Sequence, residues 1–448
     1  MLPSSLHDIA SVLDGVVVGN PVISGLTIDS RVVARGDLFV ALTARRDGHN
    51  FIANAAENGA SAALVSKPTT ILPSICVKNT QHAISQLAHA IRDSYTGEVF
   101  ALTGSQGKTS TRGFLASILT QMTQRFGSKS ILVTQQNLNN HLGVPLTVAR
   151  LRSNHLYALF ELGASAVGEI DHLAAIVRPK VSALLNARAA HLEGFGSIGG
   201  VVQGKGEIID HTSLDGTVVL NSDEPAFADW VKRAGPRSVF SVGRYSADLI
   251  WSKVSDQELR ILFEDREIKA SLPTLGQHFM ENAAFASAMA IAAGATDQEI
   301  IDGLKAASIE SGRMTPVHLG KTLLIDDTYN ANPQAVRAAI DWLATRPGTR
   351  VLTMGGLSEL GDSAESEMKA LGAYAKSKGI DRLIATGSGG PIADGYGEAA
   401  EYFATHDEVS ESLIESALDA DVILVKGSRS AQMDRVVNAL KRQRGVRL

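Results

Sequence analysis

The 448-residue chain has a single cysteine, Cys76, and no long apolar run. One cysteine cannot form an intramolecular disulfide or a cysteine cluster for a metal, so nothing indicates an oxidising compartment. No segment approaches the ~20 continuous apolar residues of a membrane-spanning helix. Residues 1–15 also lack the basic and apolar regions of a secretory signal. We therefore expect a cytoplasmic protein without membrane insertion.

A strong excess of charge of either sign is missing as well. The formal net charge is -5, which gives no electrostatic reason to expect a nucleic acid or an anionic membrane as partner. Hydrophobic residues make up 44% of the chain and charged residues 20%, as is usual for a globular protein. We expect no nucleic-acid partner, and we expect a monomer, although no sequence feature reports the oligomeric state.

Three stretches of different pattern divide the chain, whose length exceeds the roughly 100 to 200 residues of one typical domain. Residues 1–96 indicate a small α/β domain, with an extended run at 37–42 and an amphipathic stretch at 51–65. Residues 97–312 alternate apolar strands with helices, which is typical of a parallel sheet. Residues 313–448 repeat the alternation and indicate a Rossmann-like, doubly wound domain. Its expected strands are 322–325, 350–354, 382–385 and 422–425.

A phosphate-binding loop is predicted at the start of the central stretch. The sequence Thr103-Gly-Ser-Gln-Gly-Lys-Thr109 follows an apolar strand and precedes a helical run at 110–122. Glycines allow the backbone N–H groups to face phosphate oxygens, a lysine reaches the β and γ phosphates, and a threonine hydroxyl can ligate Mg²⁺. Leu102 stands where the common pattern has glycine, so the loop is a shortened form. The residues predicted to bind ATP here are Gly104, Ser105, Gly107, Lys108, Thr109 and Ser110.

Polar side chains follow the next two apolar strands. Glu161 ends a strand at 156–162, while Asn186 and His191 follow a strand at 181–186. Ligands of parallel sheets bind at the carboxyl ends of the strands, so one hard cation could contact both Glu161 and His191. A lone loop histidine is usually structural or solvated. The repeated placement at strand exits is what favours His191 as a metal ligand.

Three further residues are candidates for nucleotide contacts. Asn282 lies on one face of a helical stretch at 277–293 with His278, and an asparagine can bind an adenine edge, although an ordinary polar helix face is the alternative. Arg313 follows Gly312 at the expected joint between two domains, where a guanidinium could reach a γ-phosphate on closure. Asp327 ends a strand in a segment that helix capping explains only in part.

These residues resemble the Mur ligase family, which shares the shortened phosphate loop, and the resemblance spans nearly the whole chain. Its most specific segments are Asn139-Asn-His-Leu-Gly-Val-Pro145, His191-Leu-Glu-Gly-Phe-Gly-Ser197 and Tyr329-Asn-Ala-Asn-Pro333. The N-terminal segments 27–31, 36–42 and 47–49 look like the family's site for a UDP-sugar. The resemblance thus implies a three-domain α/β fold: a domain for the UDP-linked substrate at 1–96, a central ATP-binding P-loop domain at 97–312 and a C-terminal ligase domain at 313–448.

The resemblance also implies roles for individual residues. Lys108 would contact ATP phosphates, Thr109 and Glu161 would hold a first Mg²⁺, and His191 with Lys205 would hold a second. Asn282 would contact adenine, Arg313 a phosphate and Asp327 the ribose. The expected catalytic residues are Lys108, Glu161, His191, Lys205 and Arg313. The residues expected to bind the UDP-linked substrate are Ser30, Arg31, Asp47, Gly48, His49, Asn137, Asn139 and Asn140.

Lys205 matches the position at which the family carries a lysine carbamate. A free lysine would bring a positive charge toward a cation that neutral His191 binds poorly, whereas a carbamate brings a negative charge and two oxygens. An exposed helix lysine is the alternative, and the flanking glycines Gly204 and Gly206 give the segment little reason to be helical.

Three positions depart from the family pattern. Gln136 replaces a glycine before the paired asparagines, Ser165 stands where asparagine is common, and Met354-Gly-Gly-Leu replaces a Gly-Asp-Met pattern. We expect such changes to alter affinity or selectivity without changing the reaction class.

The implied reaction is ATP-dependent formation of an amide bond. D-Alanyl-D-alanine would be joined to UDP-N-acetylmuramoyl-tripeptide through an acyl phosphate, in peptidoglycan synthesis. Such chemistry needs positioning and charge neutralisation rather than a nucleophilic side chain, and no Ser-His-Asp or Cys-His signature is apparent. Lysine and diaminopimelate both stay open as the third residue of the tripeptide. A folylpolyglutamate-type ligase and a non-ligase P-loop ATPase are the alternatives.

Overall fold

The computed structural model describes residues 2, 4–44, 46–127, 130–308, 312–358, 360–416 and 420–443. Contacts divide the chain into two compact units, and each is described by itself. The first unit comprises residues 1–254, 258–271 and 278–307, and the second comprises 255–257, 272–277 and 308–448. Within the described ranges, no helix combines the length and apolar character needed to cross a membrane.

A five-stranded sheet forms the N-terminal part of the first unit, with strand order β2-β7-β6-β5-β4. Only the β2–β7 pair is antiparallel. The strands are β2 (Val16–Val18), β4 (Gly25–Thr27), β5 (Asp37–Val40), β6 (Ala62–Val65) and β7 (Ser74–Cys76), and β1 (Ser4–Ser5) pairs with β3 (Val22–Ile23). The helices are α1 (Leu6–Leu13), α2 (Ile52–Glu57) and α3 (Thr80–Asp93). The amphipathic stretch at 51–65 is therefore a short helix followed by a buried strand.

A nine-stranded sheet forms the rest of the first unit, in the order β16-β15-β14-β13-β12-β11-β8-β10-β9. Its strands are β8 (Glu98–Thr103), β9 (Ile131–Val133), β10 (Tyr157–Glu161), β11 (Val181–Leu184), β12 (Thr217–Asn221), β13 (Ser238–Gly243), β14 (Leu249–Lys253), β15 (Glu258–Phe263) and β16 (Arg266–Ser271). The pairs from β9 to β14 are parallel. Every residue of β10 and β11 is buried, as expected for parallel strands covered on both faces.

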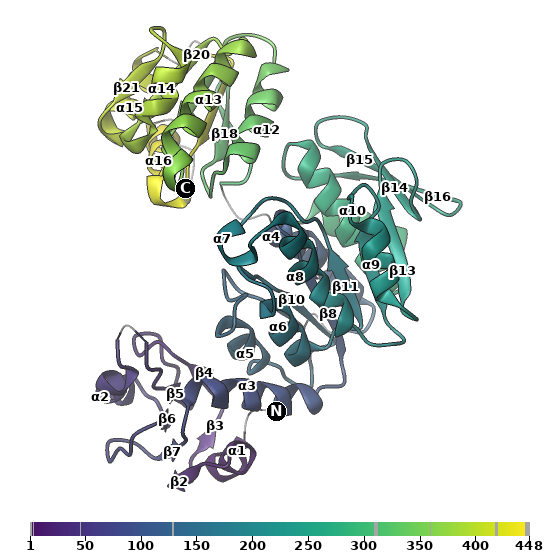
Figure 1. Ribbon diagram of the computed structural model, residues 1–448, viewed down its shortest axis with the longest axis vertical. Coiled ribbons are helices and arrows are strands. Elements are labelled where there is room, and N and C mark those ends of the chain that lie inside the picture. Colours follow the sequence, from purple (N-terminus) through teal and green to yellow (C-terminus); the bar gives the residue numbers. More distant parts are fainter. Residues whose placement is uncertain are drawn as a thin grey trace. The chain divides into compact units, whose positions relative to one another are not determined.

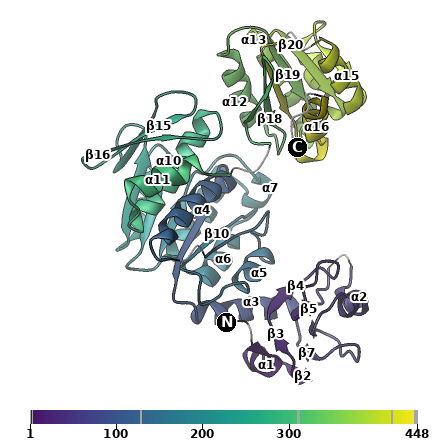
Figure 2. The same ribbon diagram turned by 180° about the vertical axis from the view of Figure 1, so that it is seen from behind.

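Helices cover both faces of this sheet. On one face α6, α8 and α9 pack against the strands (Figure 1), and on the other α4 contacts β8, β9 and β10 and is covered by α11 (Figure 2). Helix α3 connects the two sheets of the unit and packs against α5 and α6. The helices are α4 (Lys108–Gln124), α5 (Gly143–Val148), α6 (Glu169–Val177), α7 (Leu192–Phe195), α8 (Ile198–Asp210), α9 (Phe227–Ala234), α10 (Gln277–Ala292) and α11 (Asp297–Lys305).

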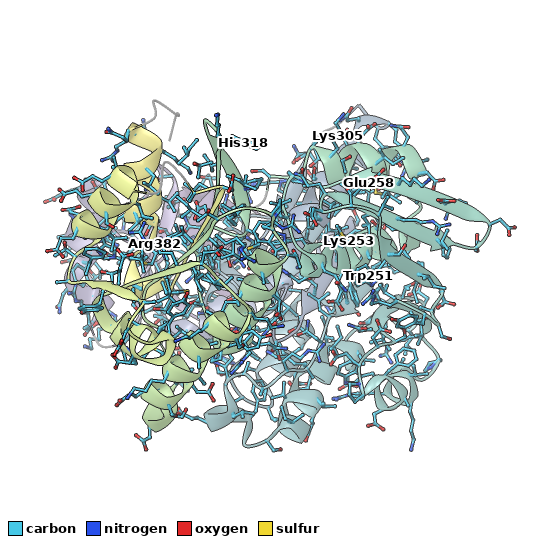
Figure 3. The ribbon with its side chains drawn as sticks, turned by 90° about the horizontal axis from the view of Figure 1, so that it is seen from above. Trp251, Lys253, Glu258, Lys305, His318 and Arg382 are labelled. Carbon is cyan, nitrogen blue, oxygen red and sulfur yellow. The ribbon has the colours of Figure 1, made fainter. Side chains whose placement is uncertain are left out.

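An antiparallel extension, which the sequence pattern did not reveal, completes the nine-stranded sheet. Strands β14, β15 and β16 pair antiparallel in register, with Trp251 opposite Ile261. Figure 3 labels Trp251 and Lys253 on β14 and Glu258 on β15. Trp251 is buried, and the side chains of these strands alternate between buried and partly or fully exposed. This alternation is usual where one face of a sheet meets solvent.

The second unit contains a six-stranded sheet in the order β17-β18-β22-β19-β20-β21. Only β17–β18 is antiparallel, so the unit is doubly wound as predicted. Its strands are β17 (Thr315–Leu319), β18 (Thr322–Asp327), β19 (Arg350–Met354), β20 (Arg382–Thr386), β21 (Glu401–Phe403) and β22 (Val422–Lys426). Its helices are α12 (Pro333–Ala344), α13 (Ala364–Ser377), α14 (Gly390–Tyr396), α15 (His406–Ser416) and α16 (Asp434–Gln443).

Candidate functional site

The phosphate loop links β8 to α4 at the carboxyl edge of the nine-stranded sheet. Gly107 has a φ of 81°, a left-handed conformation that favours glycine, and it immediately precedes the helix. Lys108 Nζ donates to the Gly104 carbonyl at 2.6 Å, so the side chain folds back over the loop. The loop N-terminal to α4 therefore presents a lysine ammonium and backbone N–H groups together, as phosphate binding requires.

Asn186 ties this loop to the neighbouring strand. Its side chain accepts from Gln106 N at 2.9 Å and donates to Gln106 O at 3.2 Å, while its carbonyl accepts from Ser105 N at 3.1 Å. The Ser105 hydroxyl in turn donates to Arg188 O at 3.1 Å and accepts from Arg188 N at 2.9 Å. These bonds fix the loop before any ligand arrives. Both hydrogen bonds of the Ser105 hydroxyl are therefore to backbone groups of Arg188.

Glu161 lies beside the loop at the end of β10 and is buried. Its Oε1 accepts from Thr109 Oγ1 at 3.3 Å and from Asn139 Nδ2 at 2.9 Å. Its Oε2 lies 3.1 Å from Arg112 NH1, an ion-pair contact. Strands β8 and β10 are parallel neighbours, which brings residues at their carboxyl ends together.

The donor set suits a hard cation held jointly with a phosphate group. Thr109 offers a hydroxyl and Glu161 a carboxylate, both oxygen ligands of the kind Mg²⁺ prefers. Glu161 Oε2 is buried and forms no hydrogen bond among the described residues. No cluster of three or more His, Cys, Asp or Glu side chains in the described ranges could hold a metal ion. Phosphate oxygens and water would therefore complete the coordination, as is usual for Mg²⁺.

Lys205 lies inside α8 and is buried, so the alternative interpretation of an exposed helix lysine is wrong. The segment is helical despite its glycines because each makes room for a neighbour. A Cβ at Gly204 would come 2.6 Å from the Phe195 ring, and one at Gly206 would come 2.6 Å from Arg233 NH1. Lys205 Nζ lies 5.1 Å from the centroid of the Phe195 ring and donates to Ala164 O at 3.0 Å.

Burial and, to a smaller extent, the nearby charge of Lys108 lower the pKa of the Lys205 ammonium to about 7. The carboxylates of Glu169 and Glu207 act in the opposite direction. Glu207 is engaged elsewhere, because its two oxygens accept from Gly168 N at 2.7 Å and Asp171 N at 2.9 Å at the start of α6. A substantial share of the Lys205 amine is therefore neutral near pH 7.

His191 is exposed and adopts a left-handed conformation with a φ of 53° at the start of α7. Its carbonyl accepts from Gly194 N and Phe195 N, which closes the short helix. The neighbouring Phe195 ring lies against Lys205. The imidazole and the Lys205 amine together do not make a favourable cation site while the amine is charged.

Helix α10 brings Asn282 to the phosphate loop. A Cβ built on Gly107 would come 2.3 Å from Asn282 Oδ1, so the glycine is required for this close approach. On the same helix, Glu281 Oε1 accepts from Asn221 Nδ2 at 2.9 Å. Burial raises the pKa of Glu281. The His278 and Phe279 rings lie with centroids 4.3 Å apart and are tilted by 43° to each other.

The predicted substrate residues of the N-terminal sheet are largely engaged with one another. Asp47 Oδ1 contacts His49 Nδ1 at 2.6 Å, and Asp47 Oδ2 accepts from Lys67 Nζ at 2.8 Å. Ser66 N donates to His49 Nε2 at 3.0 Å, so Nε2 is unprotonated and Nδ1 carries the hydrogen donated to Asp47. Lys67 and His49 lower the pKa of Asp47. A Cβ at Gly48 would come 2.6 Å from Leu42 N.

The remaining predicted substrate residues have different surroundings. Ser30 is buried, while the exposed Arg31 binds Asp29 through Nε at 2.9 Å and NH2 at 2.7 Å. Asn137 is exposed in the loop after β9. Asn140 Oδ1 accepts from Leu142 N and Gly143 N just before α5 and so orders that turn. Asn139 is the one that contacts a residue of the phosphate site, through Glu161.

At each position that departs from the family pattern, the structure shows a particular local conformation or contact. Gln136 has a φ of 47°, a left-handed conformation that residues other than glycine and asparagine rarely adopt. Ser165 N donates to Glu169 Oε2 at 2.6 Å. A Cβ at Gly356 would come 2.0 Å from Ser388 Oγ, so the serine leaves no room for an aspartate there.

In the second unit, Arg313 and Asp327 lie in one connected network. The Arg313 guanidinium carbon is 3.9 Å from the centroid of the Tyr329 ring, a cation–π contact. Asp327 Oδ2 accepts from Lys426 Nζ at 2.6 Å, and its Oδ1 accepts from Met314 N at 3.2 Å. Lys426 is buried and also donates to Asn330 O at 3.0 Å. The predicted ribose ligand thus also holds the backbone next to Arg313.

Sequence reasoning missed Arg112 and Lys426. Arg112 lies one helical turn beyond Lys108, where a cation on the inner face of a predicted helix was a usable signal. Lys426 ends an apolar strand, which is the same signal that identified Glu161.

Three family descriptions match successive parts of the chain. The Mur ligase family catalytic domain matches residues 22–93, the Mur ligase middle domain residues 102–290 and the Mur ligase glutamate ligase domain residues 312–429. A relative from Escherichia coli (strain K12), a UDP-N-acetylmuramoyl-tripeptide–D-alanyl-D-alanine ligase, is 37% identical over 98% of this chain and 99% of its own. The ligase of that name from Bacillus subtilis (strain 168) is 30% identical over 98% and 99%.

Solved structures give the same result. A crystal structure of MurF from Acinetobacter baumannii has a TM-score of 0.89 and 32% identity, covering 98% of this chain and 99% of its own. MurF ligase from Thermotoga maritima in complex with ADP has a TM-score of 0.81 and 26% identity over 94% and 98%. The chain therefore belongs to the Mur ligase family. The predicted family, three-domain α/β fold class and ATP-dependent ligase activity are confirmed.

Proposed function

We propose that this chain adds D-alanyl-D-alanine to UDP-N-acetylmuramoyl-tripeptide with hydrolysis of ATP to ADP and phosphate, and so makes the pentapeptide precursor of peptidoglycan. The ligases of that name match this chain over nearly its full length at 30% and 37% identity. The structural observation that carries the proposal is the buried Glu161 beside Thr109 at the end of the shortened phosphate loop.

We assign a different part of the reaction to each of three segments. Residues 1–96 bind the UDP-linked substrate, residues 97–312 bind ATP, and residues 313–448 complete the ligase site. Asn139 connects substrate binding with ATP binding. It follows β9 in the loop assigned to the UDP-linked substrate, and it donates a hydrogen bond to Glu161. We assign the enzyme to the cytoplasm, where its nucleotide substrates are made, and we expect it to act as a monomer.

The chemistry starts from a carboxylate, which does not accept an amine at neutral pH. The tripeptide carboxylate attacks the γ-phosphorus of ATP, ADP leaves and an acyl phosphate forms. The amine of the dipeptide then attacks the acyl carbon, phosphate leaves and the amine loses a proton. The chain's task is to hold the phosphates and offset their charge, through Lys108 and the loop N–H groups and through Arg313 on the second unit. Asn282 and Asp327 orient the adenine and the ribose.

Two Mg²⁺ ions are proposed, which would neutralise phosphate charge. Thr109 and Glu161 would hold the first together with phosphate oxygens. His191 and Lys205 would hold the second, and the charge state of Lys205 decides whether that site can bind a cation. The amine lies buried with a pKa near 7, so its neutral form is available to react with CO₂. The product is a carbamate, R–NH–COO⁻, with release of one proton, and its oxygens are suitable ligands.

Phosphate release tests the proposed function. The enzyme is incubated with ATP and Mg²⁺, and with the UDP-tripeptide, the dipeptide, both or neither. Release only with both substrates supports the ligase, and the lysine and diaminopimelate forms of the tripeptide are compared in the same assay. Release without either substrate would instead support the P-loop ATPase alternative. Release with a folate and glutamate in their place would support the folylpolyglutamate-type alternative.

A further inference from the structure

Arg112 is a buried cation that the reaction as described does not use. It lies on α4, and only 7% of its side chain is exposed. A charge this deeply buried is stable only when it is paired. Its NH1 donates to Gln136 O at 2.8 Å and lies 3.1 Å from Glu161 Oε2. One guanidinium therefore joins the helix after the phosphate loop to the end of β10 and to the loop after β9.

The contact with Glu161 affects the charge of the proposed cation site. Thr109 and Asn139 already hold Oε1 by hydrogen bonds, and the Arg112 charge is the partner of Oε2. The guanidinium thus restricts the carboxylate and offsets its charge. Removing the positive charge leaves a more negative and less constrained carboxylate, which attracts a divalent cation more strongly but orients it less well.

The contact with Gln136 affects the loop at 134–140. Gln136 holds a left-handed φ of 47°, which costs energy for a residue with a side chain. The hydrogen bond from Arg112 to its carbonyl helps to keep that conformation. Asn139 lies three residues further on and contacts the same Glu161. The loop and the cation site therefore share Arg112 as a common support.

We infer that Arg112 is a positioning residue that fixes Glu161 for the phosphate-bound cation and holds the 134–140 loop for the UDP-linked substrate. The inference rests on the proposed function for the roles of Glu161 and of the loop. As a consequence, a single side chain couples the nucleotide site to the loop that binds the UDP-linked substrate.

The test compares Arg112→Met with Arg125→Met, a control at the residue that follows the other end of the same helix. Arg125 pairs with Glu299 at 3.4 Å. In the described interactions it contacts neither the phosphate loop, nor the 134–140 loop, nor Glu161. In Arg112→Met we expect the Mg²⁺ concentration that half-saturates ADP release to fall by about threefold or more, since a positive charge is lost. The KM for the UDP-tripeptide should rise about tenfold and kcat should fall.

Calorimetry of ADP binding at varied Mg²⁺ gives a readout that does not depend on turnover. Tighter Mg²⁺-dependent binding in Arg112→Met, combined with slower catalysis, supports the inference, because a merely structural defect would weaken both. An unchanged or higher Mg²⁺ requirement in Arg112→Met would overturn it. Arg125→Met should match the unmodified enzyme in every measurement, and a matching shift in Arg125→Met would also overturn it.

Arg112→Lys keeps the test decisive if the methionine variant does not fold. A lysine retains the charge beside Glu161 but lacks the planar guanidinium that fixes NH1 between Gln136 O and Glu161 Oε2. The Mg²⁺ dependence should stay near that of the unmodified enzyme while the KM for the UDP-tripeptide rises. A KM equal to that of the unmodified enzyme would contradict the bridging role. If the unmodified enzyme itself did not ligate the two substrates, the proposed function would fail instead.

Discussion

The buried Lys205 leads to a prediction about CO₂ and pH. Carbamate formation needs the neutral amine, and an ordinary lysine with a pKa of ~10.4 is neutral in only about one molecule in 2,500 at pH 7. With its pKa lowered to about 7 by burial, the Lys205 amine is neutral in about half of the molecules at that pH. The reactive form is therefore about a thousandfold more abundant than at a surface lysine.

Protons compete with CO₂ for this amine, which fixes the sign of the pH dependence. At constant dissolved CO₂, the carbamate should increase from pH 6, where about a tenth of the amine is neutral, to pH 8, where about nine tenths is neutral. Carbon-13 NMR of the enzyme with labelled CO₂ measures the carbamate directly. Lysines at exposed sites stay protonated over this range, so their signal should be far weaker.

Lys205→Ala provides the control and the chemical rescue. The carbamate signal should disappear, ligase activity should be lost, and formate or acetate should restore part of it by supplying a carboxylate. A signal of equal strength in Lys205→Ala, or none in the unmodified enzyme at pH 8, would refute the reasoning. Full activity of Lys205→Ala without an added carboxylate would refute it as well.

Four other substitutions have defined outcomes. Lys108→Ala and Glu161→Ala should both abolish steady-state ligation, but raised Mg²⁺ should partly rescue only Glu161→Ala; two fully active variants would contradict the assignment. Gln136→Gly should relieve the left-handed backbone and raise the unfolding temperature by about 1–2 °C in calorimetry, whereas a lower temperature would show that the glutamine is not strained. Lys426→Met leaves Asp327 buried and unpaired and should cost about 3–5 kcal/mol of stability, with much of the loss recovered when Asp327→Asn is added. Unfolding of the Lys426→Met variant at the usual temperature would contradict this ion-pair account.

Local pattern was sufficient at two positions where an apolar strand ends in an acidic residue. Glu161 and Asp327 were found in this way, because residues at the ends of parallel strands must appear at one edge of the sheet. The same signal at Lys426 was overlooked. The strand bounds of β19 agree with the sequence expectation at both ends, because a mainly apolar run begins at Arg350 and ends before the glycines Gly355 and Gly356.

Long-range packing explains what the sequence did not reveal. The glycines around Lys205 argue against a helix when taken locally, yet they admit the Phe195 ring and the Arg233 guanidinium, which come from other segments. Arg112 could be recognised as a bridge only once Gln136 and Glu161 were placed beside it. The antiparallel strands β14 to β16 lack the helix-strand alternation on which the domain prediction depended.

The central claim is that the tripeptide carboxylate is activated by transfer of the γ-phosphoryl group of ATP. The most direct measurement uses UDP-tripeptide whose terminal carboxylate carries oxygen-18, together with ATP, Mg²⁺ and D-alanyl-D-alanine. In the acyl-phosphate route, one carboxylate oxygen leaves with the phosphate when the amine attacks. Mass spectrometry should therefore find one oxygen-18 in each phosphate released and one pentapeptide product for each ADP. Unlabelled phosphate, or ADP formed without the pentapeptide, would contradict the account.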